Sequence, residues 1–294
     1  MDRGYRASDA GTAHEYSESL NGSPQDQIDD AQISEPALYF MTRMKTSKVH
    51  FQNDAGQKLV GLLDEPDTGR AKAYALFSHC FTCGKSLTSM KRIATQLTEE
   101  GIGLLRFDFT GLGESSGLFA RTTFTTNLRD LRSAAAYLAS ERQAPSVLIG
   151  HSLGGAAALA VAPDIASVRC IATIGAPSDP MHVRNLLTGA TFDNNGEAKV
   201  SIGGRPFLLG ESFVSDLEAH DLPAIISQLG RPVLVFHSPV DAVVGIENSE
   251  RIFTAAKHPR SFVSLGQADH LLSDERDARF VGHVLAAWAA RYFA

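Results

Sequence analysis

The chain has 294 residues, of which 27 are lysine or arginine and 33 are aspartate or glutamate, so its formal charge is −6. Hydrophobic residues make up 44 % and charged residues 20 %, a composition typical of soluble globular proteins. The chain is mildly acidic and has no dense block of basic residues. It therefore lacks the positively charged surface by which proteins bind nucleic acids or anionic membranes. No apolar run approaches the roughly 18 residues that a transmembrane helix needs.

Residues 1–43 form the first segment, rich in Ser, Asp, Gln, Gly and Ala and without apolar periodicity. This composition predicts a flexible N-terminal arm. Because such an arm could cross to a neighbouring subunit, a homo-oligomer is a possible assembly. The arm does not contain the apolar segment, or h-region, that a secretory signal peptide carries, so we do not expect it to act as one. Three cysteines, Cys80, Cys83 and Cys170, are too few for a disulfide framework. We therefore expect a cytoplasmic location.

Strand and helix patterns alternate after the arm. We expect strands over Lys48–Asn53, Lys58–Asp64, Ala73–Ser78, Gly103–Phe109, Ser146–Gly150, Cys170–Ile174, Pro232–Phe236 and Ser261–Leu265. Helices are predicted over Leu87–Glu100, Thr125–Arg142, Leu153–Val161 and Ile246–Lys257, with a closing helix that begins after Ser273 as its N-cap. This alternation predicts one α/β domain over residues 44–294, with a doubly wound, mostly parallel sheet.

One stretch interrupts this rhythm. Residues 176–228 are more than one crossover helix needs. Within them, Ala198–Ile202 and Arg205–Leu209 flank Gly203-Gly204 and predict a hairpin. We expect a small inserted cap over the carboxyl edge of the sheet, where open α/β sheets bind ligands.

The motif that carries chemistry is Gly150-His151-Ser152-Leu153-Gly154, which matches G-x-S-x-G. A buried strand precedes it and a helix of small residues follows, as a nucleophile elbow requires. The glycines on either side relieve the crowding of so sharp a turn. We predict that Ser152 is a nucleophile; the alternative is a tight strand–helix turn with a solvent-facing serine.

A serine nucleophile needs a base that is held by an acid, and in this kind of fold the order is Ser, Asp or Glu, His. Asp241 follows the strand that ends at Phe236, and His270 follows the strand that ends at Leu265. Asp269 is a competing acid, but a neighbour in sequence is poorly placed to reach the imidazole. We expect Asp241 and His270 to complete the catalytic set.

The reaction also needs donors for an oxyanion. We expect one from the backbone N–H of Leu153 and the second from Phe81, with Cys80 as the alternative. His79 is expected to hold this loop. Cys80-x-x-Cys83 lacks a second pair at zinc spacing, so we expect no metal and two small thiol side chains, with a reversible disulfide as the alternative.

These motifs resemble the α/β-hydrolase superfamily from about Met44 to Ala294. The segments HCFTC, RFDFTGLGES, IGHSLGG, FHSPVD and ADHLL are similar to the hydrolase half of bacterial proteins in which an α/β-hydrolase is fused to an OsmC-like domain. The serine aminopeptidase-like and dienelactone hydrolase-like branches are more distant relatives. The resemblance implies the α/β-hydrolase fold with an inserted cap, and because the OsmC half is expected to be absent it implies no peroxidase activity.

We therefore expect a carboxylesterase that acts on a small-molecule ester with a short to medium acyl chain, without a cofactor and without nucleic-acid or membrane partners. Amide, peptide or thioester hydrolysis is the alternative, followed by a non-catalytic scaffold. Aminopeptidase action would need an acidic cluster, for which the cap offers Glu211, Asp216 and Glu218. Asp108 is expected to order the loop Thr110–Ser115 rather than to take part in catalysis.

Overall fold

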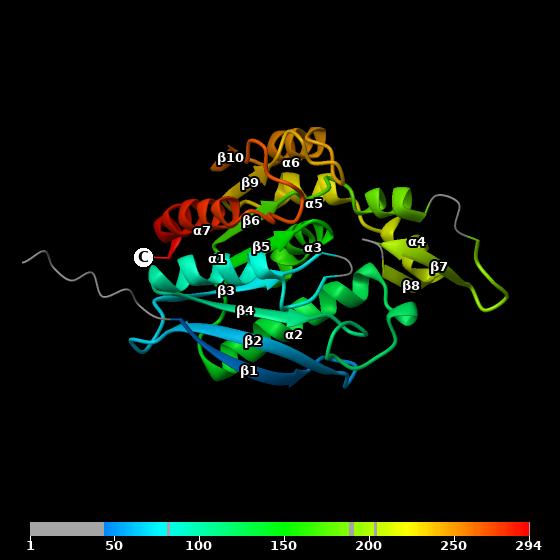
Figure 1. The fold of residues 1–294 in the computed structure, drawn as a ribbon, viewed down its shortest axis with the longest axis horizontal. Coiled ribbons are helices and arrows are strands. Elements are labelled where there is room, and N and C mark those ends of the chain that lie inside the picture. Colours follow the sequence, from blue (N-terminus) through cyan, green and yellow to red (C-terminus); the bar gives the residue numbers. More distant parts are fainter. Residues whose placement is uncertain (1–43, 81–82, 188–190, 203–204, 294) are drawn as a thin grey trace, which may run out of the picture. The chain divides into compact units, whose positions relative to one another are not determined.

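A computed structural model describes residues 44–80, 83–187, 191–202 and 205–293; the predicted arm and Phe81 lie outside these ranges. Within them, an eight-stranded sheet has the order β1-β2-β4-β3-β5-β6-β9-β10, and β7 and β8 form a separate two-stranded sheet (Figure 1). The strands are β1 (Met44–Gln52), β2 (Lys58–Pro66), β3 (Ala73–Ser78), β4 (Ile102–Asp108), β5 (Val147–His151), β6 (Cys170–Ile174), β7 (Glu197–Ile202), β8 (Arg205–Gly210), β9 (Val233–His237) and β10 (Arg260–Ser264).

The sheet is antiparallel at one end and parallel over the rest. Strands β1 and β2 pair antiparallel as a hairpin, and β2 pairs antiparallel with β4. From β4 to β10 every pairing is parallel. Because β3 has β4 on one side and β5 on the other, the winding direction reverses between β3 and β5. The carboxyl ends of strands at such a reversal leave a crevice for ligands.

Helices cover both faces of the sheet, which confirms the predicted doubly wound, mostly parallel α/β architecture. Apolar side chains of α2, α3, α5 and α6 share one core cluster, and those of α1 and α7 share the other. The helices are α1 (Thr88–Glu99), α2 (Phe124–Glu141), α3 (Leu153–Val161), α4 (Glu211–Leu217), α5 (Leu222–Gln228), α6 (Glu247–Ala255) and α7 (Glu275–Ala289), with short 3₁₀ turns η1 (Phe119–Arg121), η2 (Ala162–Asp164), η3 (Pro180–Leu187) and η4 (Ala290–Tyr292).

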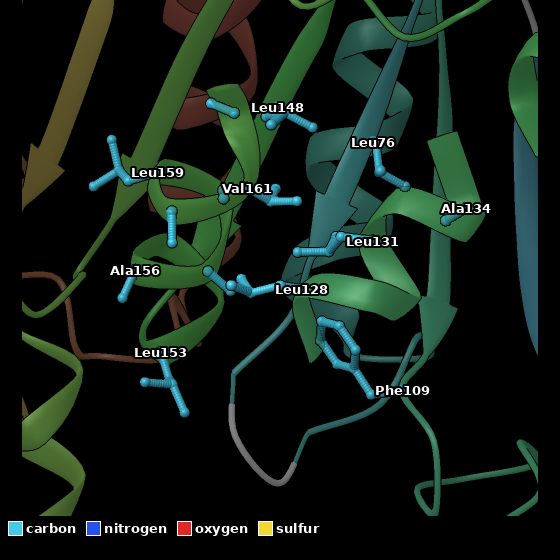
Figure 2. Packing of buried hydrophobic residues seen from close by; sticks show 14 of the residues in the cluster. Leu76, Phe109, Leu128, Leu131, Ala134, Leu148, Leu153, Ala156, Leu159 and Val161 are labelled. Carbon is cyan, nitrogen blue, oxygen red and sulfur yellow. The ribbon is translucent and has the colours of Figure 1, made fainter. Parts of the chain in front are cut away.

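The core explains the composition of the central elements. Strands β3, β4, β5, β6 and β9 are buried along their whole length, as continuous apolar runs predict. Figure 2 shows Leu128 and Leu131 of α2 packed beside α3 and the strand residues Leu76 and Leu148. Every residue of α3 is buried, and most of them are glycine or alanine, so this helix can lie close to the sheet and to its neighbours.

The closing helix begins differently from the prediction. Its N-cap is Asp274, whose side chain accepts a hydrogen bond from the backbone N–H of Arg276. The expected cap, Ser273, instead donates its own backbone N–H to Asp269. A carboxylate at the N-cap gains more from the helix dipole than a hydroxyl does, which favours Asp274.

The predicted insertion contains η3, the antiparallel β7–β8 hairpin, α4 and α5. The hairpin extends over the residues expected for it, apart from Gly203 and Gly204, which lie outside the described ranges. Ile226 of α5 is buried in the main core with α3, so this part of the insertion belongs to the body of the domain. Among the described helices, none combines the length and apolar character that crossing a membrane requires.

Candidate active site

Ser152 stands at the turn between β5 and α3. Its backbone has φ 55° and ψ −132°, a left-handed conformation that side chains seldom adopt. A β-carbon at Gly150 would collide with the main chain of Gly154, and one at Gly154 would collide with the main-chain oxygen of Ser78. The motif therefore has glycine at both positions because the turn leaves no room for a side chain, and the strain falls on Ser152.

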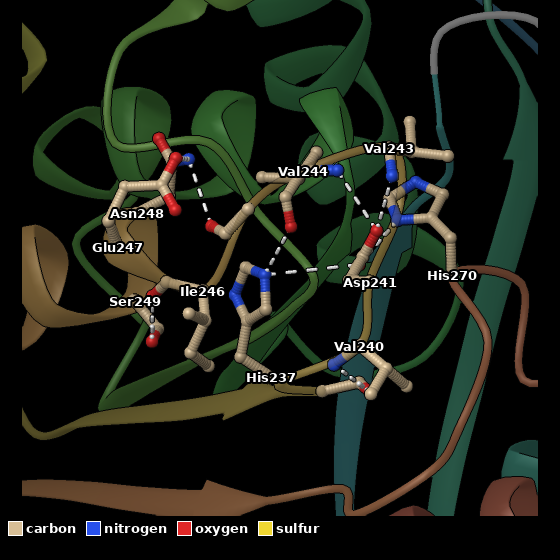
Figure 3. Close-up of polar contacts among 12 residues, drawn as sticks. His237, Val240, Asp241, Val243, Val244, Ile246, Glu247, Asn248, Ser249 and His270 are labelled. Carbon is tan, nitrogen blue, oxygen red and sulfur yellow. Dashed lines mark hydrogen bonds and ion pairs between the residues drawn. The ribbon is translucent and has the colours of Figure 1, made fainter.

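Asp241 and His270 form a hydrogen-bonded pair. His270 Nδ1 lies 2.8 Å from Asp241 Oδ2, while Asp241 Oδ1 accepts the backbone N–H groups of Val243 at 2.8 Å and Val244 at 2.9 Å (Figure 3). Burial alone would raise the pKa of Asp241, but these hydrogen bonds outweigh it and hold the pKa below its ordinary value. A carboxylate that stays ionised fixes the imidazole with its Nδ1 protonated, which leaves Nε2 free to act as a base.

The main chain brings this pair close to Ser152. Ser152 donates its backbone N–H to Ile174 at 2.9 Å, and the next residue, Gly175, has φ 53°. A β-carbon on Gly175 would lie 3.1 Å from Asp241 Oδ2 and 3.3 Å from His270 Nδ1. The three residues that the sequence singles out therefore lie after the carboxyl ends of β5, β9 and β10, around Gly175 at the end of β6.

The expected oxyanion donors are described only in part. Leu153 is the first residue of α3, so its backbone N–H has no acceptor within the helix. Phe81 lies outside the described residues. The interpretation of Cys80 and Cys83 as free thiols is wrong, because the two cysteines are joined as a disulfide. Buried beside them, His79 lies with Nδ1 2.8 Å from the Cys80 carbonyl oxygen, and burial lowers the pKa of His79, which keeps its ring neutral.

A buried ionic network anchors the end of the same loop. Lys85 donates its backbone N–H to Asp108 Oδ1 at 2.8 Å, and its ammonium group contacts both Asp108 and Glu114. Its carbonyl oxygen accepts a hydrogen bond from the guanidinium of Arg106. Asp108 also accepts the backbone N–H of Glu114 at 3.0 Å, in agreement with its expected role in ordering Thr110–Ser115. Lys85 was not identified from the sequence. Its position shortly after a predicted buried strand is the only local feature that could have pointed to its role in this loop.

The other acids have structural partners. Asp269 accepts the backbone N–H of Ser273 at 2.8 Å, at the start of the last helix, rather than the imidazole of His270. In the insertion, Asp216 accepts both the N–H and the hydroxyl of Thr125, each at 2.7 Å. Glu218 lies 3.8 Å from Arg184, with both side chains exposed. Two of the three acids that the sequence offered in the insertion are thus engaged, whereas Glu211 is exposed at the start of α4.

Two further buried histidines flank the Asp241–His270 pair. His151 Nε2 lies 2.6 Å from the carbonyl oxygen of His270, and His237 Nε2 lies 2.7 Å from that of Val244. The sequence placed His151 in the elbow motif without a partner and did not identify His237. Each ends a buried strand, but their partners are set by loops far along the chain, so a local pattern holds little signal for them.

The rim beside the pair is apolar. Three residues close in sequence to Asp241 and His270 are exposed to solvent: Val240 by 48 %, Val243 by 46 % and Leu271 by 42 %. Figure 3 shows Val243 beside the imidazole of His270. Large hydrophobic side chains left in solvent next to polar reactive groups are typical of a surface that receives an apolar ligand. In the described ranges, His, Cys, Asp and Glu side chains form no group of three that could ligate a metal.

Several known proteins are similar to this chain in sequence or in fold. Residues 70–184 match the family model of the serine aminopeptidases, S33. The esterase domain of a Rhodothermus marinus protein is 50 % identical, with a TM-score of 0.73, over 86 % of this chain and all of that domain. Est1E of Butyrivibrio proteoclasticus, solved with ferulic acid bound, is similar in fold, with 21 % identity and a TM-score of 0.72 over 83 % of this chain and 98 % of its own. The uncharacterized protein YfhR of Salmonella typhi is 25 % identical over 80 % of this chain and 77 % of its own length.

Proposed function

The chain belongs to the α/β-hydrolase superfamily, and we propose that within it the protein is a serine esterase that hydrolyses carboxylic esters through Ser152, His270 and Asp241. The observation that carries this proposal is the Asp241–His270 hydrogen bond of 2.8 Å beside the strained elbow serine. The 50 % identity to an esterase domain supports the same reaction class.

Acylation begins with the hydroxyl of Ser152. Its oxygen attacks the acyl carbon while its proton passes to Nε2 of His270, and the ionised Asp241 stabilises the imidazolium that results. The carbonyl electrons move onto oxygen, which the N–H of Leu153 stabilises together with the positive end of α3. Phe81 is the proposed second donor. The intermediate then collapses, the C–O bond breaks, and the alcohol leaves with the proton from His270.

Deacylation repeats these steps with water. His270 takes a proton from the water as it attacks the acyl-enzyme, and returns that proton to Ser152 as the acid leaves. Each turnover consumes one ester and one water and yields one acid and one alcohol, so no cofactor is needed.

The apolar rim and the small insertion support an acyl group of short to medium length. Val243 and Leu271 offer hydrophobic surface beside the reacting groups, and the insertion beyond β6 adds a single hairpin with short helices. Est1E was solved with ferulic acid, so an aromatic acid ester belongs in any substrate panel.

Peptide hydrolysis is the second candidate, because the matched family model is that of serine aminopeptidases. An aminopeptidase needs a carboxylate to bind the α-ammonium group of its substrate. Asp216 is engaged by Thr125, and Glu218 is paired on the surface. Glu211 remains exposed at the start of α4, so the engagement of the other two acids leaves a single carboxylate rather than an acidic cluster, which favours ester substrates.

The test is fluorophosphonate labelling followed by a substrate panel. We expect the wild-type protein to be labelled and Ser152→Ala to remain unlabelled, with kcat on the acetate and butyrate p-nitrophenyl esters lowered by about 10⁴-fold or more. The panel adds a long-chain ester, methyl ferulate, an aminoacyl p-nitroanilide and an acyl thioester. Absence of labelling would favour a non-catalytic scaffold, and faster cleavage of the anilide or the long-chain ester would refute the proposed selectivity.

A further inference from the structure

His151 lies directly before the nucleophile and points away from solvent. Its side chain is buried at the end of β5, with Nε2 2.6 Å from the main-chain oxygen of His270. A carbonyl oxygen can only accept a hydrogen bond, so Nε2 carries the proton and donates it. Nδ1 is buried and has no hydrogen-bond partner among the described residues.

The ring of His151 remains neutral. Burial, reinforced by the neighbouring charge of His270, lowers the pKa of His151 to about 3. The two ring centroids are 4.8 Å apart. A charged His151 would oppose the imidazolium that forms on His270 during the proposed reaction, whereas a neutral ring donates a hydrogen bond without that penalty.

The loop that carries His270 is anchored on both sides of that residue, because Ala268 and Leu272 are buried in the core. Its turns are closed by bonds from Ala268 to Leu265 and from Leu272 to Asp269, each 3.1 Å long. Leu272 has φ 53°, an uncommon conformation for its residue type. Asp241 holds the imidazole ring but not the main chain of His270. The hydrogen bond from His151 holds the main chain of His270 itself and connects the base directly to β5, the strand that leads into Ser152.

We propose that His151 is a positioning residue for the general base: through its Nε2–H bond to the His270 carbonyl, it fixes the distance between the base and Ser152. This inference rests on the proposed esterase function. His237 supports the same reading of the geometry, because it is also buried at a strand end and donates Nε2–H to Val244 in the loop that carries Asp241. Each of these two histidines thus fastens one loop of the candidate site to a rigid strand.

The experiment compares two substitutions of similar length. His151→Gln places an amide N–H near the position of Nε2 and can still donate to His270, whereas His151→Met fills similar space without a donor. Thr173→Val is the control, because Thr173 is fully buried on the adjacent strand and its hydroxyl has no hydrogen-bond partner among the described residues. Measurements are kcat and KM on p-nitrophenyl butyrate, the rate of fluorophosphonate labelling of Ser152, and thermal melting.

We expect kcat and the labelling rate of His151→Met to fall by about 10²-fold with KM nearly unchanged, since misplacing a reacting group by about 1 Å costs this much. His151→Gln should stay within about threefold of wild type, and Thr173→Val should match it. If His151 had a purely structural role, His151→Met would lower the melting temperature without lowering kcat selectively over KM. In that case His151→Gln would also not restore the wild-type kcat.

Wild-type kcat in His151→Met would overturn the inference, and so would equal losses in the Gln and Met variants. If His151→Met does not fold, His151→Asn decides, because an asparagine amide reaches only to the unpartnered Nδ1 position: a loss of kcat supports the inference, and full activity overturns it. Absence of Ser152-dependent labelling in the wild-type protein would overturn the proposed function and this inference with it.

Discussion

The carboxylate of Asp241 divides its two oxygens between tasks: Oδ2 lies 2.8 Å from His270, and Oδ1 accepts the backbone N–H groups of Val243 and Val244. The backbone bonds hold the carboxylate in one orientation, so that the oxygen facing the imidazole is fixed. An amide at this position would keep the backbone bonds to its oxygen and turn its NH₂ toward His270, which would impose the wrong tautomer.

We therefore predict that Asp241→Asn lowers kcat on ester substrates by about 10⁴-fold while the protein remains folded. The matched variant is Asp269→Asn, which changes the competing acid next to His270. Asp269 Oδ1 accepts a hydrogen bond from the backbone N–H of Ser273, and the side-chain oxygen of an asparagine can still accept this bond. The Asp269→Asn variant should retain a kcat within about threefold of wild type. Steady-state kinetics of the two variants separate the acids, and a greater loss in Asp269→Asn would contradict the assignment.

A second prediction concerns Lys85 and Lys48, which both bind Glu114. Lys85 is 5 % exposed and also binds the buried Asp108, whereas Lys48 is 49 % exposed. Lys85→Met should lower the free energy of unfolding by about 3–5 kcal/mol, because it removes the cation that pairs with the buried side chain of Asp108. Lys48→Met should cost about 1 kcal/mol or less.

Urea denaturation measures both changes. Since Lys85 anchors the end of the loop from which the second oxyanion donor is expected, kcat should also fall in Lys85→Met and stay near wild type in Lys48→Met. Equal effects of the two substitutions would show that burial of the Lys85–Asp108 pair does not matter.

The third prediction is a pH dependence of stability that comes from Tyr74. Its hydroxyl donates to Glu65 at 2.6 Å, and burial, followed by this bond and the charge of Glu65, raises the pKa of Tyr74 to about 12. Folding raises the pKa, so the stabilisation is fully present below the unfolded tyrosine pKa of about 10 and is lost as pH rises through the folded value.

Tyr74→Phe keeps the ring and removes the titrating group. The difference in free energy of unfolding between wild type and Tyr74→Phe should be constant from about pH 7 to 9 and should shrink above about pH 10. Guanidinium titrations across this range measure it. A difference that does not change up to about pH 11 would contradict the raised pKa.

The fourth prediction counts reactive thiols among the three cysteines. Cys80 and Cys83 are joined, and burial raises the pKa of Cys170 to about 12, which suppresses its reactive thiolate. Iodoacetamide should therefore leave the native, unreduced protein unlabelled, label Cys80 and Cys83 after reduction, and reach Cys170 only after unfolding. Mass spectrometry reads out each stage, and labelling without reduction would show that the pair is not oxidised.

The sequence predicted the parts of the site whose determinants are local. The elbow around Ser152 is a strand, a turn and a helix that follow one another along the chain, and its two glycines report the crowding of that turn directly. Asp241 and His270 could be chosen because each follows an apolar strand, and parallel strands bring their carboxyl ends to one edge of the sheet.

Other features depend on residues far apart in the chain or on a chemical state. His151 and His270 are 119 residues apart, and Lys85 and Asp108 are 23 apart, so their contacts arise only when the strands pack together. The oxidised state of Cys80 and Cys83 was only the alternative to two thiols, because their spacing is compatible with both states.

The sequence by itself determined the order of strands and helices, the elbow at Ser152 and the two loops that carry the proposed acid and base. Apolar periodicity, the placement of glycines and the ends of strands are properties of short segments, so the local sequence is enough to predict them. The tertiary structure decided that Asp241 rather than Asp269 bonds His270 and that the cap acid Asp216 is engaged by Thr125. It also decided that His151 and His237 bond the main chain of the loops that carry His270 and Asp241. These outcomes depend on which side chains face one another across the packed sheet, and only the folded chain fixes that geometry.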